Sequence, residues 1–507
     1  MRVSDSGLFD LIHSLSKSEK RYFKMFSRQF QKDHGALPFR LFDLIDQQKS
    51  AKDQDIKKQL NNLREHSNFS QLKADLSKLL FKSLRAFHSN HYETLSTNNR
   101  RSDFELLLNR GLNKSASQIL QNMQNHPLAI SSAWDNIYLN RLSFRLAIKD
   151  NNTDQINYLN TNYYENQLIE INRLRREFQA EYFFIQAYSL FRHHTGIHSE
   201  EIASRHKNLL QAIKRSKLAE DESIIVRLNC RKAFFFIHFS LLNFEESKIQ
   251  AQHVVRDLLS LDVEDYSVWD EISTYLINLF YIEVCLKNAT NAFALYLQLS
   301  DIWIKHPILH HSSKVYRIQS GMIQLYTDLG ELTQARSFAK KLEKQLDENY
   351  TDILAYSALI MNLVWMYLFS YQYVKAWELM QKIPSAMKVN TAPETFTGIR
   401  LTTLILLLET KNYSLLTSNA RSNERFFSSK NLVDDTMAIF LRFFKNYSLR
   451  EKNQPKKEIF QSLLEQLKLV KHPSGNLFSL FPEIAIWAKA NAENKEYVLL
   501  IRQKNNA

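Results

Sequence analysis

The residues of this sequence best suited to metal chemistry are its clustered histidines. They gather twice, in FRHHTGIH and in HPILHH, and the members are His193, His194, His198, His306, His310 and His311. Two histidines four residues apart on a helix can share a metal ion. Gly196 interrupts the first cluster, and no Cys, Asp or Glu lies close enough in sequence to complete the second. We therefore expect polar helix ends and loops, and no metal site.

Nucleophilic chemistry has equally little support. Cys230 and Cys285 lie in apolar segments outside any CxxC pattern. Two reduced core thiols in a reducing compartment are the favoured interpretation, and a disulfide is the alternative. The chain has no HExxH or GxSxG motif and no cysteine with a neighbouring histidine, although a triad can be assembled from distant residues. We expect no enzyme and no catalytic residue.

Glycine spacing bears on phosphate and cofactor binding. Loops that cradle phosphate need clustered glycines, so that backbone amides can approach the anion. The chain has only 8 glycines, and the closest pair, Gly321 and Gly330, is nine residues apart. A Walker loop and a dinucleotide fingerprint are thereby excluded, and no cofactor is expected.

The most specific local feature is a basic helix face in SKSEKRYFKMFSRQFQK. Ser16 and Glu19 form a capping box that predicts the start of the helix. Five cations then fall within about 80° of arc, with Phe23, Phe26 and Phe30 opposite them; the cations are Lys17, Arg21, Lys24, Arg28 and Lys32. Three interpretations compete: a solvated face paired with acids elsewhere in the fold, a contact to a nucleic-acid backbone, and a contact to an acidic protein or membrane surface.

The elements that position these residues are predicted to be helices. Only 8 Gly and 8 Pro occur in 507 residues, where average usage would give roughly 35 and 25. A chain so poor in turn residues favours long helices, and helical periodicity dominates over strand alternation. The net charge of +13 is concentrated at the front, since residues 1–92 contain 17 Lys and Arg against 10 Asp and Glu. We predict an all-α fold with a small basic helical domain over 1–92 and a boundary within the polar stretch 88–103.

Helix breaks recur along the rest of the chain at intervals of about 34 to 47 residues. They are expected near Gly111, Asn151-Asn152, Gly196, Asn243, Asn288, Gly330, Gln372, Asn412 and Asn446. Asn and Gly tolerate the left-handed backbone conformation at a helix end. Small residues follow in the first turn of the next helix, where two paired helices approach most closely: Ala203, Ser247, Ala292, Ala335 and Ala376. Such recurrence predicts stacked helical hairpins, each of which covers its neighbour.

Two segments carry a family resemblance. Residues 319–342, with Tyr326, Gly330, Leu332 and Ala335 in order, resemble a tetratricopeptide repeat. Residues 357–383 resemble one in Tyr367, Tyr373 and Ala376 but lack the glycine. The resemblance implies a right-handed α-solenoid of about eight or nine degenerate hairpins over residues 104–507.

The same resemblance implies a non-catalytic scaffold whose first helices line a concave groove for a protein or peptide partner. Carried over by position, the groove residues are Tyr281, Arg317, Gln324 and Trp365. Arg and Trp are frequent hot-spot residues in protein interfaces.

Membrane insertion is not expected. Residues 353–374 contain no charge over 22 positions and are long enough to span a bilayer. Polar residues interrupt the run, and a helix buried between neighbours is the favoured interpretation. The N-terminus has no secretory signal. We expect a soluble, cytoplasmic protein, and the high Lys and Asn content with little Gly or Pro suggests a bacterial source.

Three hypotheses of function follow. The first is a scaffold or adaptor that binds a protein or peptide partner in the groove. The alternative is a nucleic-acid-binding regulator that uses the basic N-terminal domain. The third, an enzyme with a dispersed site, requires a deep polar pocket with perturbed carboxylates.

Overall fold

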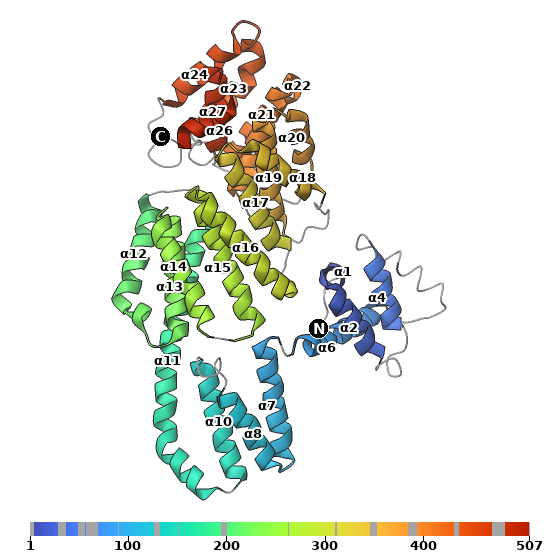
Figure 1. The fold of residues 1–507 in the computed structure, drawn as a ribbon, viewed down its shortest axis with the longest axis vertical. Coiled ribbons are helices and arrows are strands. Elements are labelled where there is room, and N and C mark those ends of the chain that lie inside the picture. Colours follow the sequence, from blue (N-terminus) through green and yellow to red (C-terminus); the bar gives the residue numbers. More distant parts are fainter. Residues whose placement is uncertain are drawn as a thin grey trace. The chain divides into compact units, whose positions relative to one another are not determined.

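The computed structural model describes residues 5–28, 37–48, 56, 69–89, 91–125, 132–150, 152–193, 200–261, 263–309, 312–344, 352–383, 393–429, 435–468 and 482–505. All elements in these ranges are helices, and the ranges contain no strand (Figure 1). The predicted all-α class is confirmed. The described chain divides into two compact units, one of residues 1–174 with 261–269 and one of residues 175–260 with 270–507.

The first unit has two separate hydrophobic cores. Its helices are α1 (Asp5–Ser14), α2 (Lys17–Arg28), α4 (Leu37–Gln47), α6 (Phe69–His88), α7 (Glu93–Asn109), α8 (Asn113–Gln124), α10 (Ala133–Lys149) and the first part of α11 (Thr153–His193). One core joins α1, α2, α4 and α6 around Phe23, Phe42 and Leu76. The other joins α7, α8 and α10 around Phe104 and Leu142.

The predicted boundary needs one correction. Residues 93–103, read from the sequence as the end of a polar connection, form the first part of α7. Polar side chains suit this stretch because its described side chains are exposed or half-buried, and fully buried side chains begin only at Phe104 and Leu108. The division of the chain at residue 92 stays a prediction.

The second unit consists of the remaining helices: the later part of α11, α12 (Glu200–Ser216), α13 (Ile224–Ser240), α14 (Phe244–Leu259), α15 (Tyr266–Cys285, from Asp270 on), α16 (Ala289–Lys305), α17 (Ser312–Asp328), α18 (Leu332–Glu343), α19 (Ile353–Phe369), α20 (Tyr373–Met380), α21 (Pro393–Glu409), α22 (Tyr413–Ser429), α23 (Asp435–Arg450), α24 (Lys456–Lys468), α26 (Pro482–Glu493) and α27 (Tyr497–Asn505). Short 3-10 helices occupy Leu218–Glu220 and Pro307–Leu309. Successive helices pack in pairs, among them α13 with α14, α17 with α18, α19 with α20 and α21 with α22.

One turn geometry recurs between paired helices. A backbone N–H just after the helix donates to the carbonyl five residues earlier, the hydrogen bond that defines a Schellman turn. It joins Leu112 to Leu107, Asn152 to Ala147, Asn243 to His238, Asn288 to Glu283, Glu331 to Tyr326, Gln372 to Tyr367 and Asn412 to Leu407, at 2.8–3.2 Å. From Asn243 to Asn412, these turns lie at intervals of 40 to 45 residues.

Most predicted breaks fall at these turns, and two points differ. The left-handed residue usually precedes the predicted Asn or Gln: Leu242, Lys287, Tyr371 and Lys411 have φ between 57° and 59°. Asn446 lies inside α23, because the buried stripe of Phe440, Phe444 and Tyr447 continues through it. Gly196 lies outside the described residues.

The predicted small residues pack where paired helices meet. Ser247, Ala292, Ala335 and Ala376 are completely buried, and the Ser247 hydroxyl donates to the Phe235 carbonyl at 3.1 Å. Ala203, in α12, is only half-buried.

The first helices of successive pairs also contact one another in chain order. Phe235 of α13 and Tyr275 of α15 have ring centroids 5.6 Å apart. Gly321 of α17 lies against the Phe280 ring of α15, α19 packs on α17, and α21 packs on α19. This arrangement of neighbouring pairs is compatible with a helical-repeat solenoid.

Helix α19 contains most of the uncharged run tested above for a membrane span. It is enclosed by α17, α18, α20 and α21, and most of its residues are buried, as the sequence predicted. No described helix has the length and apolar character that crossing a membrane requires.

Candidate functional site

The basic face of α2 is positioned by its cap and its buried side. The Glu19 carboxylate accepts from the Ser16 backbone N–H at 2.7 Å, and the Ser16 hydroxyl accepts from the Glu19 N–H at 3.2 Å, as the capping box predicted. Phe23 is buried against Phe42 of α4, with ring centroids 4.6 Å apart. These contacts fix which side of α2 faces outward.

Helix α4 supplies acids that neutralise part of the basic face. Lys24 pairs with Asp43 at 2.7 Å, and Lys20, just beside the predicted stripe, pairs with Asp46 at 2.6 Å. The structure thus joins one predicted cation, Lys24, to a carboxylate in the same fold.

Three of the other predicted cations do not share the ion pairing seen at Lys24. Lys17, Arg21 and Arg28 are exposed and make no ion pair with a residue that the structure describes. Lys32 lies outside the described residues.

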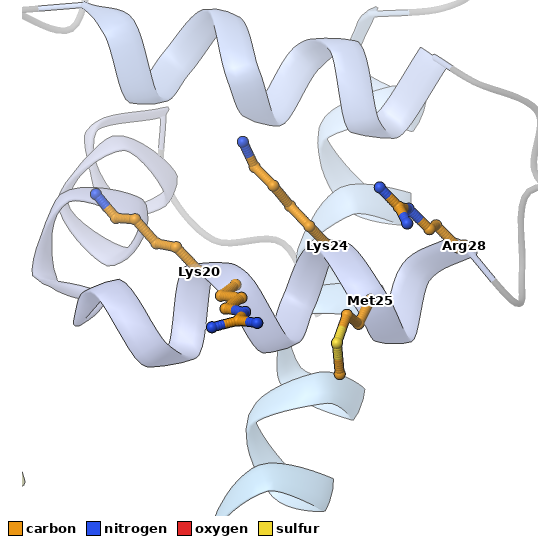
Figure 2. Close-up of a pocket in the computed structure, with 5 residues that line it drawn as sticks. Lys20, Lys24, Met25 and Arg28 are labelled. Atoms are coloured by element: carbon orange, nitrogen blue, oxygen red, sulfur yellow. The ribbon is translucent and has the colours of Figure 1, made fainter.

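An open hollow runs beside this part of α2. Its volume is about 520 Å³, and its lining residues are Lys20, Arg21, Lys24, Met25 and Arg28. Figure 2 shows Lys20, Lys24 and Arg28 extending from α2 toward one side, with Met25 on another. Lys20 and Lys24 are paired with acids of α4, whereas Arg21 and Arg28 make no ion pair with a described residue. The charge of these two arginines beside the exposed Met25 thioether favours an anionic ligand with some apolar surface.

Two predicted groove residues come together. The Tyr281 hydroxyl on α15 donates to the Arg317 carbonyl on α17 at 2.7 Å. The Arg317 guanidinium lies 5.6 Å from the centre of the Tyr281 ring and donates to Asn278 Oδ1 at 3.4 Å. Burial raises the pKa of the Tyr281 hydroxyl above its usual value, with Arg317 opposing the shift. Both side chains are half-buried.

The other two predicted groove residues are separate from this pair. Gln324 is half-buried two turns further along α17. Trp365 is only 6% exposed and packs against Phe369 inside the largest core. Its indole has no surface for a partner, because neighbouring helices enclose α19 on all sides. The position carried over from the repeat family does not hold for Trp365.

Sequence reasoning missed the polar links beside Arg317. Lys314 of α17 donates to the Asp270 carboxylate of α15 at 2.6 Å. Asn362 of α19 donates to the Ser320 hydroxyl of α17 at 2.9 Å. These pairs are 44 and 42 residues apart, close to the repeat interval, which is the signal that could have revealed them.

Most of the histidines singled out for metal chemistry lie outside the described residues. His194, His198, His310 and His311 lie outside the described residues, as does the side chain of His193. Within the described chain, no group of three or more His, Cys, Asp or Glu is placed to hold a metal ion. Cys230 and Cys285 form no disulfide. Cys230 is buried, and burial raises the pKa of its thiol to about 12, whereas Cys285 is exposed and not the core residue expected.

Comparisons of the chain with protein-family models, with curated proteins and with solved structures found no match.

Proposed function

We propose that this protein is a non-catalytic cytoplasmic scaffold of bacterial origin that holds a protein or peptide partner against a right-handed, tetratricopeptide-repeat-like stack of helical hairpins. The observation that carries the proposal is the recurring Schellman turn, which returns every 40 to 45 residues from Asn243 to Asn412. A turn repeated at that interval gives successive hairpins the same connection between their two helices. Arrays of this kind offer long continuous surfaces for binding.

The surface best suited to a partner lies along α15 and α17. It carries Arg317 over Tyr281, the ion pair of Lys314 with Asp270, and Gln324. A half-buried arginine supported by an aromatic ring is held in place before binding, which lowers the entropy cost of contacting a carboxylate or a backbone carbonyl.

The test is affinity capture of the full-length protein from its native cells, with and without nuclease, followed by quantitative mass spectrometry. We expect a defined partner protein that survives nuclease and is lost with Arg317→Glu. Lys340→Glu, an exposed charge reversal on α18, is the matched control and should keep the partner. Retention that is unchanged by Arg317→Glu, with both variants folded by circular dichroism, contradicts the proposal.

A second function is favoured by the basic hollow of α2. Lys17, Arg21 and Arg28 project from one short helix without an ion pair to a described residue, and phosphate neutralisation requires clustered cations. The alternative proposal is therefore a nucleic-acid-binding regulator that contacts the phosphate backbone through α2.

Fluorescence anisotropy of the full-length protein with short DNA and RNA duplexes tests the alternative. Affinity for one of them should fall steeply with salt, and Arg21→Glu with Arg28→Glu should abolish binding. Lys340→Glu with Lys341→Glu changes the charge equally on α18 and should preserve it. Absence of binding to both duplexes at low salt would contradict the nucleic-acid-binding proposal.

A further inference from the structure

The hairpin of α26 and α27 contacts hairpins that lie far back in the chain. Its two helices are joined by the same Schellman hydrogen bond as the earlier pairs, from the Lys495 N–H to the Ala490 carbonyl at 3.0 Å. Helix α27 is buried on one side only. The side chains on that side are exposed by 3% or less: Tyr497, Leu500 and Ile501. Leu499, on the other side, is 49% exposed.

The buried side of α27 lies against the turns of two earlier hairpins. The Tyr497 ring stacks on Tyr371, the left-handed residue between α19 and α20, with ring centroids 5.0 Å apart. Further along α27, the Arg502 guanidinium donates to the Gly330 carbonyl, in the turn between α17 and α18, at 3.4 Å. Ile501 Cγ2 lies 3.5 Å from the position that a methyl group on Gly330 would take. Both contacts are to turns and not to the middle of a helix.

The contacts of this hairpin follow the earlier hairpins in reverse order. Trp487 of α26 donates to Glu409 at the end of α21, Tyr497 meets the turn after α19, and Arg502 meets the turn after α17. From Tyr497 to Arg502 the rise along α27 is about 7.5 Å. Packed helices lie about 8–10 Å apart, so this short helix is long enough to bridge one hairpin and the next.

We propose that α27 is a detachable strap. While it is bound, it holds the hairpins α17–α18 and α19–α20 at a fixed spacing, and when it detaches it lets them move relative to one another. Helix α27 has nine residues, and a helix of that length is marginal in water by itself, so it depends on the three side chains that it buries. Helix α19, in contrast, keeps its contacts with α17, α18, α20 and α21 when α27 leaves. The strap is a property of the hairpins themselves and goes beyond the binding of a partner.

Double electron–electron resonance in the full-length protein tests the spacing. The spin labels are placed at Ser337 of α18 and Glu378 of α20, both exposed, in a background with both native cysteines replaced by serine. The distance distribution should be narrow with α27 unaltered. Ile501→Glu should widen it by about twofold or more, because the carboxylate cannot stay unpaired in an apolar contact. Leu499→Glu puts the same charge on the exposed side of α27 and should leave the width unchanged.

Hydrogen exchange followed by mass spectrometry separates detachment from global unfolding. In the wild-type chain the amides of α27 should exchange at least about 10-fold faster than those of α19, and Ile501→Glu should accelerate the exchange of α27 and not that of α19. Equal exchange rates of α27 and α19 in the wild type would overturn the inference. A distance distribution unchanged by Ile501→Glu would also overturn it, as would a loss of helicity in that variant larger than one nine-residue helix.

Discussion

At the scale of single residues, Gly321 of α17 lies directly against the ring of Phe280 of α15. A methyl group built on Gly321 would lie 2.4 Å from Phe280 Cε1 and 3.0 Å from Cζ. Phe280 is completely buried, so its ring has no space into which to move. The glycine is required for the approach of α17 to α15, although glycine in a helix interior is otherwise unfavourable.

Gly321→Ala should therefore lower the stability of the protein. Overpacking costs about 1–3 kcal/mol, and the better helix propensity of alanine returns about 1 kcal/mol, which leaves a net loss of about 0–2 kcal/mol. Because the added methyl group would lie only 2.4 Å from Phe280 Cε1, we expect a loss toward the upper end of that range in urea unfolding. Adding Phe280→Leu should recover part of it. An equal or higher stability of Gly321→Ala would contradict this packing.

The pair of Glu19 and His88 gives a pH prediction. The two side chains lie 2.7 Å apart and are nearly buried. Burial alone would raise the pKa of Glu19, but hydrogen bonds from the His88 ring and from Ser16, with the charge of His88, lower it below its ordinary value of 4.5. A carboxyl whose pKa is lower in the folded state contributes stability above its unfolded pKa and loses it as the pH falls.

The free energy of unfolding should thus fall as the pH drops below about 4.5, in part because Glu19 takes up a proton. Glu19→Gln removes the titrating group and should make the pH dependence between about 5 and 3 shallower. Chemical unfolding across that range measures it. A variant with the same pH dependence as the wild type would show that Glu19 does not contribute.

At the scale of elements, the C-terminal helices are joined by one carboxylate. Glu409, the last residue of α21, has a side chain only 6% exposed. It accepts from Trp487 Nε1 of α26 at 2.8 Å and from Lys456 Nζ of α24 at 3.1 Å. One side chain therefore connects three helices that are up to 78 residues apart in sequence.

Glu409→Ala should cost about 1–3 kcal/mol in urea unfolding, because it leaves the buried Trp487 N–H without its acceptor; the Lys456 amine is 41% exposed and can be solvated. The matched control is Glu424→Ala on α22, whose side chain is 44% exposed and pairs with Lys445; it should change stability by less than about 1 kcal/mol. Similar losses of stability in both variants would show that Glu409 contributes no more than an exposed ion pair.

The elements were largely predictable, and their contacts were only partly so. Hydrophobic periodicity and the scarcity of Gly and Pro predict the helices, and the recurrent breaks predict most turns. The sequence predicts the left-handed residue of one turn at Asn288, whereas the structure has it one position earlier, at Lys287. The hydrogen bonds of the turn, rather than side-chain preference, decide which residue takes this conformation. Trp365 was misplaced for a related reason: a sequence pattern does not show that α19 is enclosed by its neighbours.

At the basic face of α2 as well, contacts between helices could not be predicted from the sequence. The spacing of Lys17, Arg21, Lys24 and Arg28 predicts one charged stripe, but Asp43 and Asp46 are more than ten residues further along the chain. Only the packing of α4 beside α2 shows that Lys24 is paired with Asp43, while Arg21 and Arg28 make no ion pair with a residue that the structure describes.

At the scale of the whole molecule, a stack of hairpins requires that hairpins succeed one another in space as they do in sequence, as α17, α19 and α21 do. Equivalent exposed positions on the second helices are Ala294, Ser337, Glu378 and Ser418, on α16, α18, α20 and α22. Packed helices lie about 8–10 Å apart, so each further hairpin should add a similar increment of distance.

Double electron–electron resonance between spin labels at Ala294 and at each of the other three positions measures the distances between hairpins most directly. The labels require a background with Cys230 and Cys285 replaced by Ser, and dilution with unlabelled protein restricts the distances to one chain. We predict distances that increase in the order Ser337, Glu378, Ser418. Distances that fail to increase in that order would contradict the stacked-hairpin account.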